Sequence, residues 1–193
     1  MTVDKTNGTP DQTPADQPST PPASIRAREA TQVFDIGCDH HRRGRLDDAI
    51  RAYVKALVLN PDYPEAYTNM GVALRNQGKF EAALVCYRRS LNLNADNPGL
   101  YSNMGNVLRD LGRHNQAMEA LETAMRLDPD SPNAVYNLGL VLRDVARLET
   151  ALTCFDKALA MRPGYAECAV DRGITLLMMG NYEKGFRGYG WRW

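Results

Sequence analysis

Residues 64–97 read PEAYTNMGVALRNQGKFEAALVCYRRSLNLNADN, and residues 98–131 repeat the same order of proline, glycine, alanine and large apolar positions. One glycine series recurs every 34 residues, at Gly37, Gly71, Gly105, Gly139 and Gly173. A second series follows it, at Gly44, Gly78, Gly112 and Gly180, with Ala146 in the fourth place. A third series of small residues comprises Ala49, Ala83, Ala117, Ala151 and Gly185. A fixed period of this length indicates a chain built from tandem repeats.

The three series divide the chain into a tail and five units. We assign the tail to residues 1–29 and the units to 30–63, 64–97, 98–131, 132–165 and an incomplete 166–193. The first 24 residues hold five prolines among Thr, Asp, Gln and Ser, with one large aliphatic residue after the initial Met. Such a segment cannot bury enough apolar surface to offset the entropy lost on ordering. We therefore predict a disordered N-terminal tail followed by one repeat domain.

Each unit has the sequence pattern of two helices. Apolar residues recur at helical spacing, as at Tyr67, Met70 and Leu74 in the second unit. The first helix is expected to begin at a proline, whose missing N–H would be unpaired there in any case. These prolines are Pro64, Pro98 and Pro132. The first glycine series falls inside the first helix, where a side chain of hydrogen lets the second helix approach, and we expect the alanine series to face it. The pattern predicts an all-α fold, an α-solenoid of helix–turn–helix units.

Composition narrows the classes of partner. The 193 residues include 23 basic and 23 acidic side chains, so the formal net charge is zero. Neutrality argues against a nucleic-acid or anionic-membrane binder, because phosphate binding depends on clustered Lys and Arg. No apolar run approaches the roughly 18 residues of a membrane-spanning helix. We therefore expect a cytoplasmic protein that binds neither nucleic acid nor membrane.

Residues with catalytic or metal-binding potential are few. The four cysteines, Cys38, Cys86, Cys154 and Cys168, form no C-x-x-C pair, and they are read as apolar side chains in a reducing compartment. The His40-His41 pair near Cys38 lacks a second ligand pair at zinc-like spacing. The chain carries no nucleophile elbow, metalloprotease motif or phosphate-binding loop. We predict no catalytic residue, no metal site and no cofactor, and hence no enzyme.

The repeats resemble the tetratricopeptide repeat family. The fourth unit carries the family pattern most fully, in Leu138-Gly139, Leu142, Ala151, Phe155, Ala158 and Pro163. The resemblance implies a right-handed superhelix in which the first helices line a concave groove. It also implies that the protein is an interaction module with a protein or peptide ligand.

A ladder of short polar side chains is expected on the groove face of the first helices. The sixth position of the five units holds Asp35, Asn69, Asn103, Asn137 and Asp171, and Asn106 extends this ladder in the third unit. A side-chain amide offers donors and an acceptor, which suits the backbone of an extended peptide of any sequence. The ladder resembles that of the O-linked N-acetylglucosamine transferase repeats. The alternative is that these asparagines bond to a neighbouring repeat.

An arginine series lies at the twelfth position, in Arg75, Arg109 and Arg143. At the groove rim these guanidinium groups would add contacts to carboxylates or phosphates of a ligand. The alternative is a solvated face with weak ion pairs between repeats.

The C-terminal segment is rich in aromatic residues. Phe186, Tyr189, Trp191 and Trp193 follow the start of the last helix without a capping helix, and they would expose an apolar patch. The segment resembles the stretch that joins repeats to a glycosyltransferase domain in bacterial tetratricopeptide proteins. The chain would then be the substrate-docking part of a glycosyltransferase whose catalytic domain is missing or separately encoded. Otherwise the aromatic end docks on a partner or a second copy of the chain, or folds back on the fourth unit.

Deletion of residues 186–193 separates these alternatives for the C-terminal segment. If the aromatic residues form an interface, the deletion lowers the self-association measured by light scattering, because the apolar patch is lost. An unchanged mass would argue that the segment folds back on its own chain.

Overall fold

The computed structural model describes residues 22–189, with side chains described as far as Phe186. Most of the predicted tail, residues 1–21, lies outside the described residues. Within the described part, every regular element is a helix. The first helix begins at Ala23, so it extends into the segment that we assigned to the tail through residue 29. Pro22 precedes this helix and fits its first turn, because proline needs no N–H partner there.

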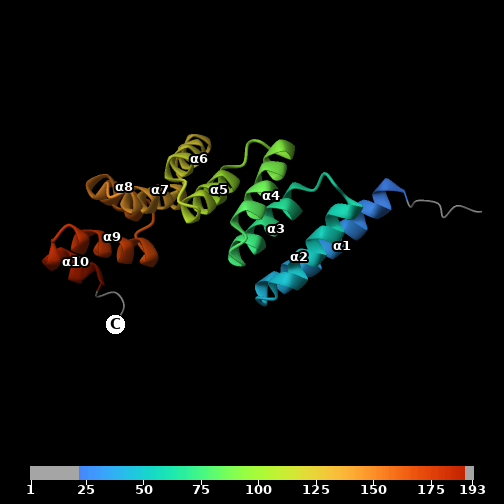
Figure 1. The fold of residues 1–193 in the computed structure, drawn as a ribbon, viewed down its shortest axis with the longest axis horizontal. Coiled ribbons are helices and arrows are strands. Elements are labelled where there is room, and N and C mark those ends of the chain that lie inside the picture. The colour runs from blue at the N-terminus through green and yellow to red at the C-terminus, as the bar shows by residue number, and fades with distance from the viewer. Residues whose placement is uncertain (1–21, 190–193) are drawn as a thin grey trace, which may run out of the picture.

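Ten helices follow one another through residues 23–189 as five antiparallel pairs (Figure 1). They are α1 (Ala23–Arg42), α2 (Leu46–Leu59), α3 (Pro64–Asn76), α4 (Phe80–Leu93), α5 (Pro98–Asp110), α6 (His114–Leu127), α7 (Pro132–Asp144), α8 (Leu148–Met161), α9 (Ala166–Met178) and α10 (Tyr182–Tyr189). Each odd-numbered helix packs on the even-numbered helix that follows it, and each pair packs on the next. The pairs form an elongated array with α1 and α10 toward opposite ends (Figure 1). The predicted solenoid is confirmed.

The helix starts and turns follow the residues that predicted them. Helices α3, α5 and α7 begin at the three prolines named above. The turns inside the pairs hold Gly44, Gly78, Gly112 and Gly180 at φ between 71° and 78°. Ala146 takes the same place in the fourth turn at φ 59°. A left-handed backbone costs an L residue about 1–2 kcal/mol, so Ala146 is strained where glycine is not.

The glycines inside the first helices lie against one large side chain of the second helix. A Cβ on Gly139 would lie 2.6 Å from Cε1 of Phe155, and one on Gly105 would lie 2.6 Å from Cγ of Leu121. Tyr53 and Tyr87 occupy the equivalent place against Gly37 and Gly71. Each of these large side chains lies four residues after a member of the alanine series, on the same face of the second helix. The alanines are buried, but the large side chain reaches the glycine first, because it extends further from its helix.

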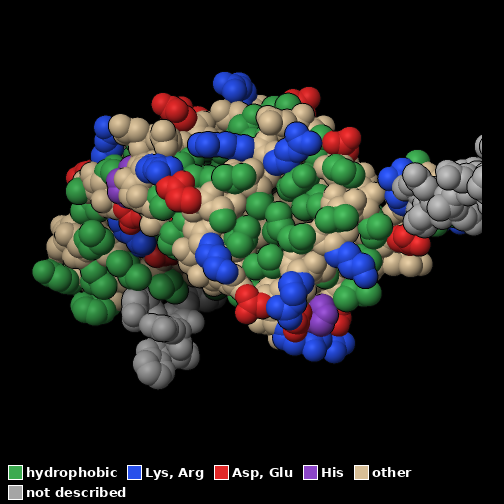
Figure 2. Space-filling model, turned by 45° about the vertical axis from the view of Figure 1, so that its right-hand side comes forward, with side chains coloured by type: hydrophobic (Ala, Val, Ile, Leu, Met, Phe, Trp, Pro, Cys, Tyr) green, Lys and Arg blue, Asp and Glu red, His purple; other side chains and the backbone are tan. Residues whose placement is uncertain are grey.

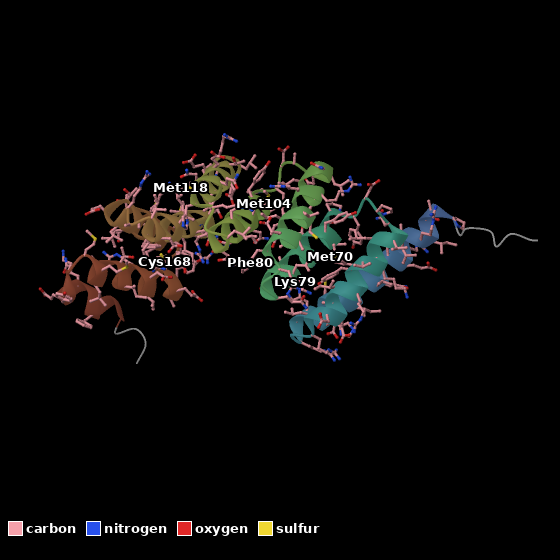
Figure 3. The ribbon with its side chains drawn as sticks, in the orientation of Figure 1. Met70, Lys79, Phe80, Met104, Met118 and Cys168 are labelled. Atoms are coloured by element: carbon pink, nitrogen blue, oxygen red, sulfur yellow. The ribbon has the colours of Figure 1, made fainter. Side chains whose placement is uncertain are left out.

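The apolar core runs through the array without a break between repeats 2 and 5. A central cluster around Tyr87, Leu100 and Leu121 and a second cluster around Phe155 share the partly buried Met118. Met104 and Phe80 pack on the central cluster, and Cys168 belongs to the second (Figure 3). None of the described helices is long and apolar enough to cross a membrane.

Replacing Ala146 with glycine is expected to stabilise the protein by about 1 kcal/mol, because glycine adopts the left-handed backbone of the turn without strain. Thermal and urea unfolding followed by circular dichroism would measure the gain. Gly112→Ala is the matched reverse change in the preceding repeat, and it should destabilise by a similar amount. A loss of stability in Ala146→Gly would contradict this account of the turns.

Candidate functional site

A polar cleft of about 500 Å³ lies between the first helices of repeats 2, 3 and 4. Its principal polar groups come from α5, from α7 and from the residues just before these helices. They are Asn97, Ser102, Asn103, Asn106, Ser131 and Asn137. Thr68 of α3 and Tyr165, which precedes α9, complete two of its walls. The cleft thus spans the middle of the array.

Three of the predicted ladder residues meet in this cleft. Asn103, Asn106 and Asn137 are half-buried, and within residues 22–186 their amides make no hydrogen bond. Asn69 differs, because its Nδ2 donates to Sγ of Cys38 in the preceding repeat at 3.4 Å. At Asn69 the structure therefore follows the alternative we left open, a bond to a neighbouring repeat. The other three amides are available to a ligand.

Hydroxyl groups add to the polarity of the cleft. Ser102 is only 9% exposed, lines the cleft and has no hydrogen-bond partner among the described residues. Thr68 and Asn97 also border a smaller cavity of about 110 Å³ beside the cleft. There the hydroxyl oxygens of Thr68 and Ser90 are 2.9 Å apart. The Ser90 hydroxyl donates to the Pro64 carbonyl. The polar surface therefore continues from the cleft toward α4.

Among residues 22–186, no charged side chain lines the cleft. A guanidinium stands at its edge, where Nη1 of Arg162 donates to Oδ1 of Asn133 at 3.2 Å and the group lies 4.7 Å from the Tyr165 ring centroid. Over the wider surface, acidic and basic side chains are interspersed on the face shown in Figure 2. The cleft is therefore a neutral, hydrogen-bonding surface within a mixed-charge protein.

The arginine series forms ion pairs between repeats. Arg75 donates to Asp110 of the next repeat at 2.8 Å, and Nε of Arg109 lies 3.6 Å from Oδ2 of Asp144. The first repeat has His41 at the same position, where its ring nitrogen lies 3.3 Å from the Asn76 amide. These contacts match the alternative that we gave for the arginines. A ligand carboxylate would have to compete with them.

The last arginine of the series has a different partner. Met178 stands where an Asp would follow the series, and Arg143 instead donates to Asp171 at 2.6 Å. The Tyr136 hydroxyl donates to the other oxygen of Asp171 at 2.6 Å. Burial, and then Asp171, raise the pKa of Tyr136 above its ordinary value. Asp171 is thus occupied, so the ladder ends for a ligand at Asn137.

The described part of the C-terminal segment is exposed. Tyr182 and Phe186 have 64% and 63% of their surfaces exposed, next to the exposed Met178 and Met179. The side chain of Tyr189, together with Trp191 and Trp193, lies outside the described residues. The C-terminal interface stays a prediction.

Sequence reasoning missed half of the cleft. Asn97, Ser131 and Tyr165 are the last residues of their repeats, and we examined only positions on the helices. Ser102 and Thr68 directly precede the ladder residues Asn103 and Asn69, and no role was predicted for them. Comparing the last position of all the repeats would have shown that repeats 2 and 3 carry small polar residues there, where repeats 1 and 4 carry tyrosine.

Two cysteines of the described residues carry thiols that ionise only at high pH. Burial raises the pKa of the Cys86 thiol to about 11 and that of Cys168 to about 12, which disfavours the nucleophilic thiolate. Among residues 22–186, no three His, Cys, Asp or Glu side chains are grouped to hold a metal ion.

The repeats match known families in sequence. The TPR repeat profile matches residues 37–78, 71–108 and 105–144, and the tetratricopeptide repeat profile matches residues 132–165. A comparison with curated proteins found no match.

Several solved structures share the fold. PilF of Pseudomonas aeruginosa is 23% identical with a TM-score of 0.75, over 86% of this chain and 76% of PilF. MamA of Desulfovibrio magneticus RS-1 is 22% identical with a TM-score of 0.72, over 83% of this chain and 91% of that one. YrrB, described as a TPR protein with an unusual peptide-binding site, is 23% identical with a TM-score of 0.63, over 86% of this chain and 88% of YrrB. At these identities the likeness shows the fold alone.

Asp171→Asn is expected to lower the pKa of Tyr136 toward its ordinary value, because the carboxylate that opposes the tyrosinate is lost while burial still holds the pKa up. An alkaline titration of tyrosinate absorbance would measure the shift, with Tyr136→Phe identifying the signal. Below about pH 10 the neutral phenol of Tyr136 adds to the free energy of unfolding. This contribution is lost as the pH rises from the ordinary tyrosine pKa through the raised pKa of Tyr136. The substitution should also cost about 1–3 kcal/mol, since an uncharged amide with one accepting oxygen replaces the carboxylate that accepts from both Arg143 and Tyr136. An unchanged Tyr136 titration would contradict the network.

Proposed function

The chain belongs to the tetratricopeptide repeat family, and from this premise we propose that it is an interaction module that binds an extended peptide segment in the polar cleft. The peptide would lie across α3, α5 and α7, with its backbone hydrogen-bonded to the amides of Asn103, Asn106 and Asn137. The unpaired state of these three neighbouring amides is the observation that carries the proposal.

The energetics favour a peptide backbone as the ligand. Asparagine in a helix interior is less favourable than alanine by several tenths of a kcal/mol, and these amides make no hydrogen bond with residues 22–186 that would offset the cost. Each hydrogen bond to a ligand contributes about 0.5–1.5 kcal/mol net. Micromolar affinity corresponds to about 8 kcal/mol, so three amides alone are insufficient. The hydroxyl groups of the cleft and the Tyr165 ring supply the further contacts.

The arginine series has a structural role in this proposal. Arg75, Arg109 and Arg143 hold consecutive first helices together through carboxylates of the following repeats. Recognition of the peptide therefore depends on the neutral cleft, and a charged terminus of the ligand is not required.

We retain the cytoplasmic location suggested by the cysteines, all four of which are free thiols. Association with a glycosyltransferase through the aromatic C-terminus remains a second candidate, favoured by the exposure of Tyr182 and Phe186. Co-purification of a glycosyltransferase with the full chain, and its loss on deletion of residues 186–193, would support that candidate.

The peptide-binding proposal predicts that Asn103→Ala, Asn106→Ala and Asn137→Ala together weaken peptide binding at least about tenfold, because three hydrogen-bonding groups are removed. The probe is a random peptide library displayed on phage, selected on the full chain, with affinities of selected peptides measured by calorimetry. Asn92→Ala, at an exposed position of α4 outside the cleft, is the matched control and should bind normally.

Circular dichroism of the triple variant distinguishes the two roles of the ladder. Unchanged helicity with lost binding supports recognition by the amides. A lost fold would show that the asparagines are structural, and unchanged binding would show that the peptide lies elsewhere.

A further inference from the structure

Two positions in each repeat vary together and decide whether a cavity opens beside the first helix. We call them the junction pair: the fifth residue of the repeat, on the first helix, and the last residue of the repeat. The four complete pairs are Phe34 with Tyr63, Thr68 with Asn97, Ser102 with Ser131, and Tyr136 with Tyr165. Repeats 1 and 4 therefore carry aromatic pairs, which we call the outer junction pairs. Repeats 2 and 3 carry small polar pairs, which we call the inner junction pairs.

The outer junction pairs are in ring contact. The Phe34 and Tyr63 centroids are 5.0 Å apart, and those of Tyr136 and Tyr165 are 4.9 Å apart. Phe34 and Tyr136 each also contact the large ring of their second helix, at 5.7 and 6.0 Å. The outer junctions are thus filled by packed aromatic side chains.

The inner junction pairs leave space of the same kind unfilled. Thr68 and Asn97 line both the cleft and the smaller cavity beside it, and Ser102 and Ser131 line the cleft. Ser102 is nine-tenths buried and has no hydrogen-bond partner among residues 22–186. Its Oγ stays accessible from the cleft, so its donor and acceptor are available to a ligand group.

We propose that the part of the cleft left open by the inner junction pairs is a specificity subsite, which takes an uncharged hydrogen-bonding side chain of the bound peptide, that of Gln, Asn, Ser or Thr. The inference rests on the proposed peptide-binding function and adds the class of side chain that is recognised. The outer junction pairs confine this subsite to the middle of the array.

The lining of the subsite selects against charge. A ligand carboxylate or ammonium group would leave water for a cleft in which residues 22–186 offer no lining group of opposite charge. The smaller cavity, which Glu65 borders, lies outside the subsite. Arg162 is not part of this lining and stands at the edge of the cleft, where it bonds to Asn133 and stacks on the Tyr165 ring. Asp, Glu, Lys and Arg are therefore disfavoured in the subsite.

The same lining selects against purely apolar side chains. A Leu or Val side chain would displace water from Ser102, Asn103 and Asn106 without offering them a hydrogen bond, and unpaired buried polar groups are unfavourable. An amide or hydroxyl replaces that water with complementary donors and acceptors. Neutral polar side chains remain as the class that fits.

The test begins with peptides selected from the random phage-displayed library on the full chain. Each position of a selected peptide is replaced in turn by Gln, Ser, Leu, Glu and Lys, and affinity is measured by calorimetry. We expect one position at which Glu, Lys and Leu each weaken binding at least about tenfold relative to Gln. A selected peptide that tolerates Glu, Lys or Leu equally well at every position overturns the inference and leaves the peptide-binding function standing.

Ser102→Tyr with Ser131→Tyr places in repeat 3 the junction pair that repeat 4 already holds. Because Tyr136 and Tyr165 pack there without strain on the fold, the variant should remain helical while its subsite is filled. The preference for Gln over Leu and Lys at the chosen position should disappear. Val85→Tyr with Asn92→Tyr, at two exposed positions of α4, is the matched control and should keep the preference.

A second variant tests the subsite with almost no change of shape. Asn97→Asp introduces a carboxylate into an inner junction pair and keeps the Oδ1 that accepts from the Leu100 amide, so Lys at the chosen position should bind at least about tenfold more tightly than it does to the parent. If the preference is unchanged in both variants, the inference is overturned. If the parent selects no peptide at all, the proposed function itself fails, and this outcome is distinct from the loss of preference alone.

Discussion

The repeats depend on one contact, between a glycine in the first helix and a large side chain of the second. The ring of Phe155 and the branched end of Leu121 lie so close to Gly139 and Gly105 that a methyl group there would overlap them. This contact sets how near the two helices of a pair can come. Because it recurs at the same place in successive repeats, each pair has nearly the same geometry, and the pairs stack at a constant interval.

Constant stacking brings residues 34 or 35 positions apart into a fixed relation. The Arg75–Asp110 and Arg109–Asp144 ion pairs are direct products of that relation, because each joins one repeat to the next. Where Met178 replaces the acid, the arginine of the fourth repeat turns back to Asp171. The same relation aligns Asn103 and Asn137, so that amides separated by a whole repeat face one cleft.

Repeats 2 and 3 differ from repeats 1 and 4 in how they use the space between repeats. In repeats 1 and 4, aromatic pairs fill the junctions and add apolar contacts to the core. In the middle, hydroxyl and amide groups stand in the same places, and several make no bond within the described part of the protein. Repeats 2 and 3 therefore lack the aromatic packing that repeats 1 and 4 have at the same positions. A surface of unpaired neutral groups is suited to a ligand that brings its own donors and acceptors, as a peptide does.

The 34-residue period, the prolines at the helix starts and the glycines in the turns were sufficient to predict the solenoid, because each has a local backbone cause. The start of the first helix was not predicted, because residues 23–29 lack the repeat pattern. In the structure they form the first turns of α1, the helix that packs on α2. The ladder asparagines could be placed on one face by periodicity alone. Which of them remain unpaired was decided by tertiary structure: Asn69 reaches Cys38, whereas Asn103, Asn106 and Asn137 face open space. The arginines likewise pair with carboxylates of the following repeat, and only the packed structure shows which carboxylate each arginine reaches. Sequence determined the repeated helix pair, because its signals lie within one unit; the cleft arises between units, where only the packed array sets the distances.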